Sequence, residues 1–381
     1  MIQHHGIRPE HILVITFTKA AANEMKIRFR NLCPEVGSVT FGTFHSVFFW
    51  ILRNAYNYTG TDIITDAEKY GAVRDSIERH GFRYDSQEDF ARNVLGEIGC
   101  VKSEMCDLKS YESTTMKTDD FRVVYDDYEN FLRYRGKIDF DDMLVFTYEL
   151  LSQRQDILDM WRNRFQYILI DEFQDINTIQ YDTVKLLAKE RNNIFAVGDD
   201  DQSIYGFRGA APAIMKRFPK DFPGTKIEYL NMNYRCSYDV VECSKRIIKN
   251  NTDRYDKNLQ SAFAPGESDR VHIVKVKDGT EQNRKIVDKI RELNSAGIPY
   301  SDIAVIFRTN TEPRALSSKL MENGIPFSMK DSIPNIFTHF LAENIFDYIK
   351  LARGCRERRV LLRVINKPNR YICLLYTSPS P

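Results

Sequence analysis

Residues 167–175 read YILIDEFQD, a short apolar run that ends in two adjacent carboxylates, Asp171 and Glu172. Such a run between polar flanks predicts a buried strand. In α/β sheets ligands bind beyond the carboxyl ends of the strands, so we expect both acids to face a ligand crevice. One carboxylate near Mg²⁺ and a second that orients or deprotonates water would serve the hydrolysis of a nucleoside triphosphate. A solvent-facing strand cap explains the same two acids equally well.

Residues 195–209 read FAVGDDDQSIYGFRG and repeat the arrangement of an apolar run with polar residues at its end. The Gln202 amide can bond both a γ-phosphate oxygen and a water molecule, and so can sense whether the phosphate is present. An acidic triplet such as 199–201 is ordinarily a solvated turn. Its position directly after a predicted strand and downstream of Asp171 and Glu172 nevertheless indicates a triphosphate site.

Short apolar runs recur along the chain, each followed by residues with a helical period. Alternation of short buried strands with helices predicts an α/β protein with parallel sheets and helices on both faces. No comparable strand occurs from Tyr58 to Trp161, which reads as a helical insertion. Pro219, Pro223 and Gly224 separate two alternating blocks, which predicts two α/β domains. The predicted strands are 12–17, 39–41, 167–172, 194–198, 227–230, 271–276 and 303–307, and the first two lead into helices that reach Arg30 and cover 43–54.

Composition bounds the class of protein without identifying it. The 381 residues are 43% apolar and 28% charged, and no apolar stretch approaches the roughly 20 residues that span a bilayer. Neither a secretory signal nor a transit peptide is visible, so we expect a cytoplasmic protein that contacts no membrane. Seven cysteines without a Cys-x-x-Cys pair predict reduced thiols. The net charge of +1 neither favours nor excludes a nucleic acid.

At the level of motifs, the chain resembles the UvrD-like DNA helicases of superfamily 1, the family of UvrD, PcrA and Rep. Residues 171–175 (DEFQD) and 198–210 (GDDDQSIYGFRGA) are similar to motifs II and III of that family. Upstream, 15–25 (ITFTKAAANEM) and 42–46 (GTFHS) are similar to motifs Ia and Ib. Downstream, 230–237 (LNMNYRCS) is similar to motif IV, and the order and spacing of the motifs match throughout.

The resemblance implies a role for each residue of the predicted nucleotide site. ATP and Mg²⁺ are the implied cofactors, with Asp171 holding Mg²⁺ through water and Glu172 acting as the catalytic base. Gln202 would contact the γ-phosphate. Arg235 would reach across the cleft as an arginine finger, and Tyr234 would stack on the adenine. Without the other motifs, Tyr234 reads as an ordinary core aromatic and Arg235 as a surface ion-pair partner.

The partners that the resemblance implies are single-stranded DNA and junctions of single- and double-stranded DNA, and no protein partner is indicated. Hydroxyl groups and a ring nitrogen would contact phosphates and sugars without reading sequence. Phe207 would stack on a base, a contact worth roughly 1 to 3 kcal/mol. His45 could instead cap the following helix. The implied DNA-binding residues are Thr16, Phe17, Thr18, Lys19, Gly42, Thr43, Phe44, His45, Ser46, Tyr205, Phe207 and Arg208.

The family's fold implies two RecA-like parallel-sheet domains, both incomplete, with a helical insertion in the first. The resemblance covers residues 2–371. Residues 373–381 finish TSPSP without a helical or strand period, and we expect a non-native tail there. The implied division is 1–57 and 146–221 for the first RecA-like domain, 58–145 for the helical insertion, 222–355 for the second RecA-like domain and 356–372 for the start of a second insertion.

A phosphate-binding loop of the form G-x-x-x-x-G-K-[ST] occurs nowhere in the sequence. In the family it precedes motif Ia, so we expect it upstream of Met1, with motifs V and VI downstream of Tyr371. The parent protein would then be an ATP-dependent 3′-to-5′ DNA helicase of DNA repair or replication, and this chain alone an inactive ATPase. Two alternatives stay open, the motor of a helicase-nuclease of the RecB or AddA type and an inactive DNA-binding module.

Overall fold

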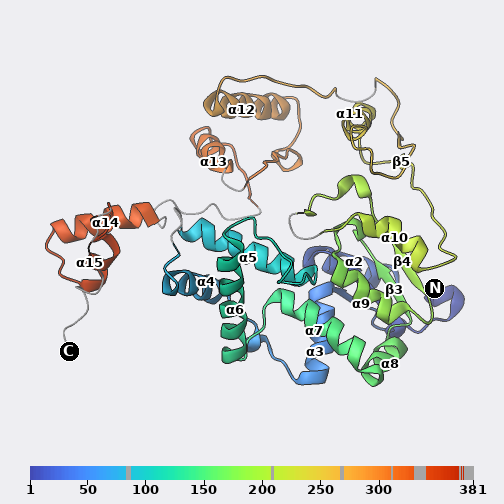
Figure 1. The fold of residues 1–381 in the computed structure, drawn as a ribbon. Coiled ribbons are helices and arrows are strands. Elements are labelled where there is room, and N and C mark those ends of the chain that lie inside the picture. The colour runs from blue at the N-terminus through green and yellow to red at the C-terminus, as the bar shows by residue number, and fades with distance from the viewer. Residues whose placement is uncertain are drawn as a thin grey trace. The chain divides into compact units, whose positions relative to one another are not determined.

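The computed structural model divides the chain into two compact units, Met1–Val271 and His272–Pro381 (Figure 1). The structure describes residues 1–82, 87–206, 210–266, 270–309, 312–329, 340–368, 370 and 372. Within these ranges, no helix is both long enough and apolar enough to cross a membrane. Each unit has its own helices and its own buried apolar cluster, and each is described by itself below.

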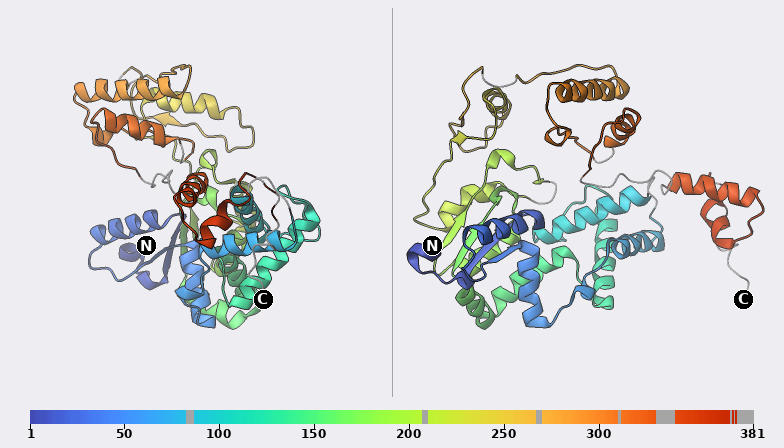
Figure 2. Two further views of the ribbon diagram at one scale, coloured as in Figure 1. Left: turned by 90° about the vertical axis from the view of Figure 1, so that its left-hand side faces the viewer. Right: turned by 180° about the vertical axis from the view of Figure 1, so that it is seen from behind.

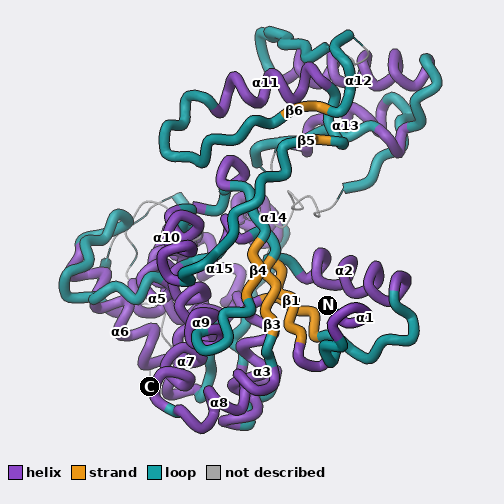
Figure 3. Tube along the Cα trace, turned by 90° about the vertical axis from the view of Figure 1, so that its right-hand side faces the viewer, coloured by secondary structure: helices purple, strands orange, loops and turns teal. Residues whose placement is uncertain are grey.

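A four-stranded parallel sheet forms the centre of the first unit. Its strand order is β2-β1-β3-β4 (Figure 3), and every neighbouring pair runs in parallel, which confirms the predicted parallel sheet. In β1, Ile15 lies opposite Gly42 of β2 on one side and Ile170 of β3 on the other. The carboxyl ends of the strands therefore meet at one edge, where ligands bind in such sheets. The strands are β1 (Ile12–Thr16), β2 (Thr40–Thr43), β3 (Tyr167–Ile170) and β4 (Ile194–Ala196).

Helices pack against this sheet around one apolar core. Phe44, Phe48 and Ile51 of α3 are buried in the same cluster as Ile168 and Ile170 of β3. Full burial of each such side chain stabilises the fold by about 1.5 to 3 kcal/mol. The helices of this part are α1 (Ile2–His5), α2 (Lys19–Leu32), α3 (Phe44–Tyr56), α7 (Phe140–Gln153), α8 (Gln155–Arg164), α9 (Thr178–Ala188) and α10 (Ala213–Asp221). Helix α11 (Tyr238–Ile248) also belongs to the first unit but contributes no residue to this core.

The interval predicted to be a helical insertion is helical and has a separate core. Val94 and Phe121 are fully buried within it, and its helices gather in one group, coloured blue to green in Figure 2. The chain enters and leaves this group side by side, because Ile63 forms a bridge with Ile138. Asp139 then caps the first turn of α7. The helices of the insertion are α4 (Asp66–Arg79), α5 (Gln87–Ser103) and α6 (Thr118–Arg135).

Three predicted strands are wrong, because the structure describes them as loops: 227–230, 271–276 and 303–307. An apolar run becomes a strand only where a neighbouring backbone satisfies its N–H and C=O groups. Leu230 and Ile273 are instead 87% and 92% exposed. The described residues of this region pair only briefly, with β5 (Met232–Asn233) lying parallel to β6 (Gln260–Ser261).

In the described part of the second unit, the α-helices form two pairs. Val287 of α12 packs with Leu316 and Leu320 of α13 in a small apolar cluster. In the other pair, the Tyr348 hydroxyl of α14 donates a hydrogen bond to the Val364 carbonyl of α15, at 3.0 Å. The helices are α12 (Gly279–Ser295), α13 (Pro313–Glu322), α14 (Phe340–Ala352) and α15 (Arg358–Val364).

Six cysteines lie in the described part of the chain, in both units, and all are free, in agreement with the predicted thiols.

Candidate nucleotide-binding site

The carboxylates Asp171 and Glu172 lie directly after β3. This strand ends at Ile170, two residues earlier than predicted, and Glu172 then adopts a left-handed backbone conformation with φ of 53°. A non-glycine residue in this conformation costs about 1 to 3 kcal/mol, and such residues cluster at functional sites. The turn leaves Glu172 exposed and Asp171 half-buried. Both acids therefore stand at the sheet edge that the sequence predicts for ligand binding.

The electrostatics of this edge suit a divalent cation. Burial and the neighbouring Glu172 carboxylate raise the pKa of Asp171 above its usual value. The same two causes raise the pKa of Asp175 to about 6. No lysine or arginine among the described residues offsets either group. Neighbouring carboxylate oxygens without a counter-charge are the donor set that Mg²⁺ prefers.

Gln174 connects the ends of β3 and β4, a role that the motif strings did not reveal. Its buried side chain donates from Nε2 to Glu172 Oε2 at 2.7 Å. Its Oε1 accepts the backbone N–H of Asp199 at 3.0 Å. A Cβ at Gly198 would lie 2.7 Å from the same Oε1, so a larger residue there would displace the Gln174 amide. The available signal was a polar amide between Glu172 and Asp175, in the turn that directly follows an apolar strand.

Gln202 follows β4 in a short 3₁₀ turn. Its side chain is exposed, and Nε2 donates to Asp199 Oδ2 at 2.8 Å. Since Gln174 also binds Asp199, hydrogen bonds run continuously from Glu172 to Gln202. The structure thus connects two residues that the sequence places 30 positions apart.

Tyr234 and Arg235 face the same hollow as Gln202. Asn233 Oδ1 accepts the N–H groups of Arg235 and Cys236 at 2.9 and 2.8 Å, a turn that presents both side chains. A cavity of about 570 Å³ is lined by Gln202 and residues 233–236. Tyr234 is 78% exposed, so its interpretation as a core aromatic is wrong. Asp171 and Glu172 do not line this cavity and reach it only through the hydrogen bonds of Gln174 and Asp199.

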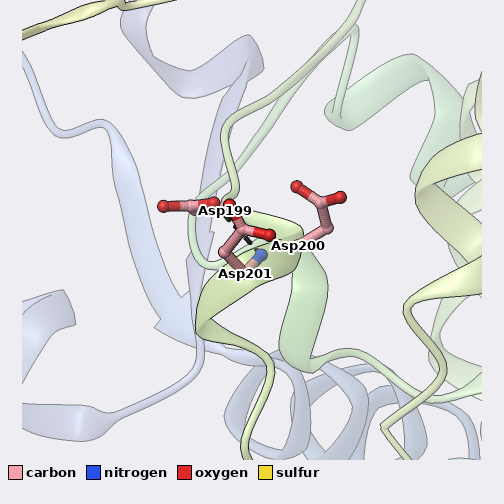
Figure 4. A group of neighbouring side chains, drawn as sticks. All are labelled: Asp199, Asp200 and Asp201. Atoms are coloured by element: carbon pink, nitrogen blue, oxygen red, sulfur yellow. Dashed lines mark hydrogen bonds between the residues drawn. The ribbon is translucent and has the colours of Figure 1, made fainter. Parts of the chain in front are cut away.

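Figure 4 shows the three side chains of the acidic turn, residues 199–201. The turn is less solvated than its composition suggests, because the Asp200 and Asp201 side chains are only 7% and 17% exposed. One oxygen of each carboxylate lies within 4.8 Å of the others. Lys257 contacts all three carboxylates, and Arg254 binds Asp201 with two hydrogen bonds of 2.8 and 2.6 Å. Two cations thus occupy the position that a metal ion would need. Sequence reasoning missed both basic residues, since nothing local to them signals a partner so far upstream.

Some of the predicted DNA-binding residues gather at the ends of β1 and β4. The rings of Phe17 and Tyr205 lie 4.9 Å apart, which brings the segments similar to motifs Ia and III together. Thr18 caps α2 by accepting the Ala21 N–H at 3.2 Å, and Lys19 is exposed in the first turn of the same helix. An exposed cation beside a helix N-terminus is suited to a phosphate. Phe207 and Arg208 lie outside the described residues.

Two of the predicted DNA contacts are wrong as side-chain contacts. Thr16 is fully buried, and its hydroxyl donates to the Thr18 carbonyl at 2.9 Å. Phe44 is buried in the core of the sheet. Gly42 is buried as well, where a Cβ would lie 2.7 Å from Ser46 Oγ, so a larger residue there would displace the Ser46 hydroxyl.

The cap of α3 belongs to Thr43 and not to His45. Thr43 and Ser46 form a reciprocal capping box, with Ser46 N donating to Thr43 Oγ1 at 3.3 Å. The alternative of a capping histidine is therefore wrong. His45 packs edge-on against Phe140, with ring centroids 5.7 Å apart. Burial, with a smaller contribution from Lys69, lowers the pKa of His45, so its ring stays neutral at physiological pH.

Comparison with known proteins agrees with these motifs. The family described as "UvrD/REP helicase N-terminal domain" matches residues 1–223, and "UvrD-like helicase C-terminal domain" matches residues 229–374. The chain is 35% identical to YjcD of Bacillus subtilis over 92% of its own length and 46% of that protein. It is 31% identical to the ATP-dependent DNA helicase PcrA of Staphylococcus epidermidis, over 98% of this chain and 51% of that protein.

The PcrA protein of Staphylococcus aureus is similar at 30% identity, over 97% of this chain and 51% of that protein. The chain therefore spans about half the length of the curated relatives it matches. The family match alone covers well over half of the chain and includes the strand-end carboxylates and Gln202. The chain belongs to the UvrD/REP helicase family.

Proposed function

We propose that the protein to which this chain belongs is an ATP-dependent DNA helicase that moves 3′ to 5′ along single-stranded DNA. The observation that carries the proposal is the cavity that Gln202 shares with Tyr234 and Arg235. Hydrogen bonds through Gln174 connect this cavity to Glu172. A γ-phosphate sensor, an arginine and a carboxylate base are the groups that phosphoryl transfer to water requires.

Each group has one task in the proposed site. Asp171 would hold Mg²⁺ through water, and the ion when bound would neutralise charge on the phosphates. Glu172 would take the proton of the attacking water, and Gln202 would hold that water against the γ-phosphate. Arg235 would stabilise charge on the transferring group. Tyr234, already exposed, would stack on the adenine.

For DNA, we propose the surface that begins at Phe17 and Tyr205 and continues over the start of α2. Thr18 and Lys19 would contact phosphates there, and Phe207 would stack on a base. Such contacts tolerate any sequence, which suits a motor that steps along a strand. Junctions of single- and double-stranded DNA, a role in repair or replication, and a cytoplasmic location belong to the same proposal.

No phosphate-binding loop of the form G-x-x-x-x-G-K-[ST] occurs in the 381 residues, and we propose that the full-length protein supplies this loop from outside them. Backbone N–H groups of such a loop cradle the phosphates, and its lysine and hydroxyl meet the nucleotide and Mg²⁺. We therefore propose that the chain alone has no appreciable ATPase activity. The proposed domains are the RecA-like halves 1–57 with 146–221 and 222–355, the insertion 58–145, and a second insertion that begins at 356.

The experiment measures DNA-stimulated ATP hydrolysis by the full-length protein. Loss of a general base costs about 10²- to 10⁴-fold, so Glu172→Gln should lower kcat by at least 100-fold. Arg235→Ala should lower kcat by roughly 10³-fold. Glu190→Gln is the matched control, because Glu190 pairs with Arg162 away from the strand ends and should leave kcat unchanged. Unchanged turnover in Glu172→Gln would refute the proposed site.

A second measurement addresses the chain by itself. Purified residues 1–381 should release no phosphate from ATP, with or without single-stranded DNA. Hydrolysis that DNA stimulates and that Glu172→Gln abolishes would show that this chain holds its own phosphate-binding groups. That result would overturn the proposed dependence on a loop outside the chain.

A further inference from the structure

A short basic segment docks onto the acidic turn, residues 199–201. Lys257 Nζ contacts all three carboxylates of the turn, at 3.0 Å to Asp201. Arg254 grips Asp201 with Nε and Nη2 at 2.8 and 2.6 Å. Between them, the Tyr255 N–H donates to the middle carboxylate of the turn at 2.7 Å. We call residues 254–257 the docking segment.

These contacts are shielded from solvent well enough to hold a fixed geometry. The Lys257 side chain is 19% exposed, and the side chain of Asp200 is buried beneath it. Ion pairs at this burial are screened less by salt than exposed pairs, and a two-pronged arginine fixes orientation as well as distance. The hydrogen bonds of Arg254 and Lys257 outweigh burial and hold the pKa of Asp201 below its usual value. The acidic turn therefore binds the docking segment in one defined geometry.

From the contact between the acidic turn and the docking segment, two stretches of backbone lead to the cavity that Gln202 and Arg235 line. On one side, the acidic turn continues directly into Gln202. On the other side, the docking segment leads to β6. The Gln260 N–H donates to the carbonyl of Asn231, just before β5, at 2.7 Å, and the Ala262 N–H donates to the carbonyl of Asn233 in β5 at 2.9 Å. β5 ends in the turn that presents Tyr234 and Arg235.

The two stretches of backbone meet again at the cavity, which Gln202 and residues 233–236 line together. The contacts thus form a closed ring. The acidic turn is ion-paired to the docking segment, which leads through β6 and β5 to Arg235, and Arg235 faces Gln202, the residue after the acidic turn, across the cavity. Ion pairs at the acidic turn close the ring at one side, so they determine how far Gln202 stands from Arg235. A shift of 1 Å in such a pair of groups can cost about 100-fold in rate.

We propose that Lys257 and Arg254 are positioning residues, which hold Gln202 and Arg235 at the separation needed to grip a γ-phosphate. This inference rests on the proposed function of the cavity. Neither residue touches the nucleotide. Because the separation matters most for charge that develops during phosphoryl transfer, loosening the ring lowers turnover more than it weakens nucleotide binding.

The experiment compares steady-state ATP hydrolysis by variants of the full-length protein in saturating single-stranded DNA. Lys257→Ala should lower kcat at least tenfold while KM for ATP changes less than threefold. Lys257→Arg, which keeps a cation among the three carboxylates, should stay within threefold of the unmodified protein. Lys216→Ala is the matched control: Lys216 pairs with Asp253, next to the docking segment, but outside the ring. It should leave both constants unchanged.

Hydrogen exchange on the 381-residue chain supplies a readout that does not depend on turnover. Lys257→Ala should speed amide exchange at least fivefold in peptides covering 199–205 and 231–236, and Lys216→Ala should not. Unchanged exchange together with an unchanged kcat would overturn the inference. Equal losses of kcat in Lys257→Ala and Lys257→Arg would also overturn it, since the lost property would then not be the cation's position.

Failure of the proposed function gives a different pattern. If Glu172→Gln retains ATPase activity, the cavity is not the site of hydrolysis, whatever Lys257→Ala does. If Glu172→Gln is inactive while Lys257→Ala turns over normally, the site stands and the positioning role alone is refuted.

Discussion

Two clusters in this molecule place one lysine against three carboxylates in different surroundings, and Arg254 adds a second cation to one of them. In the helical insertion, the Lys102 side chain is 4% exposed and contacts Glu129, Asp139 and Asp142 at 2.5, 3.0 and 2.7 Å. At the end of β4, Lys257 is several times more exposed among the carboxylates of the acidic turn. The chemistry of the pairs is the same, so their burial and their neighbours decide what each cluster does.

The Lys102 cluster holds one core together. Asp139 also accepts the buried Tyr128 hydroxyl at 3.0 Å and forms a reciprocal cap with Asp142 at the start of α7. Lys102 of α5 and Tyr128 of α6 both bind carboxylates at the start of α7, the helix by which the chain returns to the sheet, and Glu129 joins α6 to α5. The Lys257 cluster instead joins the acidic turn to a segment that leads back to the cavity. We infer that the first cluster serves stability and the second serves the geometry of the site.

The largest expected effect is on the stability of the insertion. Lys102→Ala leaves buried carboxylates without a counter-charge, which costs about 3 to 5 kcal/mol. The free energy of unfolding from urea titrations of the 381-residue chain checks this. Lys109→Ala, at an exposed lysine nearby, should stay within about 0.5 kcal/mol of the unmodified chain. If Lys102→Ala lost less than about 1 kcal/mol, the Lys102 cluster would not be more important for stability than the Lys257 cluster, and the difference inferred between them would be wrong.

An effect of intermediate size is expected on the pH dependence of stability, at Asp141 beside the Lys102 cluster. Burial and then the charge of Asp139 raise the pKa of Asp141 to about 6. The folded chain therefore keeps a proton that the unfolded chain releases near pH 4, so stability falls as pH rises from about 4 to 6. Asp141→Asn should be more stable by about 1 kcal/mol at pH 7 and equally stable below pH 4. A difference that does not change with pH would contradict this origin.

The smallest expected effect is on stability at the acidic turn. Lys257→Ala should lower the free energy of unfolding by only about 1 kcal/mol, because its ion pairs are less buried than those of Lys102. Added salt at 1 M should shrink that loss, since screening acts on charges that solvent reaches. The loss in Lys102→Ala should persist at the same salt concentration. A loss above about 3 kcal/mol for Lys257→Ala would make both clusters structural and weaken the positioning role.

Much of the nucleotide edge followed from local pattern. Asp171 and Glu172 after an apolar run, and Gln202 after the next one, occupy the predicted sheet edge because strand period and strand ends are local properties of sequence. Predictions failed where a partner elsewhere decides the outcome. Thr16 reads as an available hydroxyl, yet the fold buries it against its own turn. The run 227–230 reads as a strand, yet the structure gives it no strand to pair with.

The sequence by itself determined the family, the parallel sheet and the residues after its strands, since motif strings and hydrophobic period are written along the chain. Only the tertiary structure decided that Gln202 shares a cavity with Arg235, and that Lys257 meets carboxylates 57 and 58 residues upstream. A lysine in a polar stretch has many possible partners. The folded backbone selects one of them, because charges interact through space while sequence records only their order.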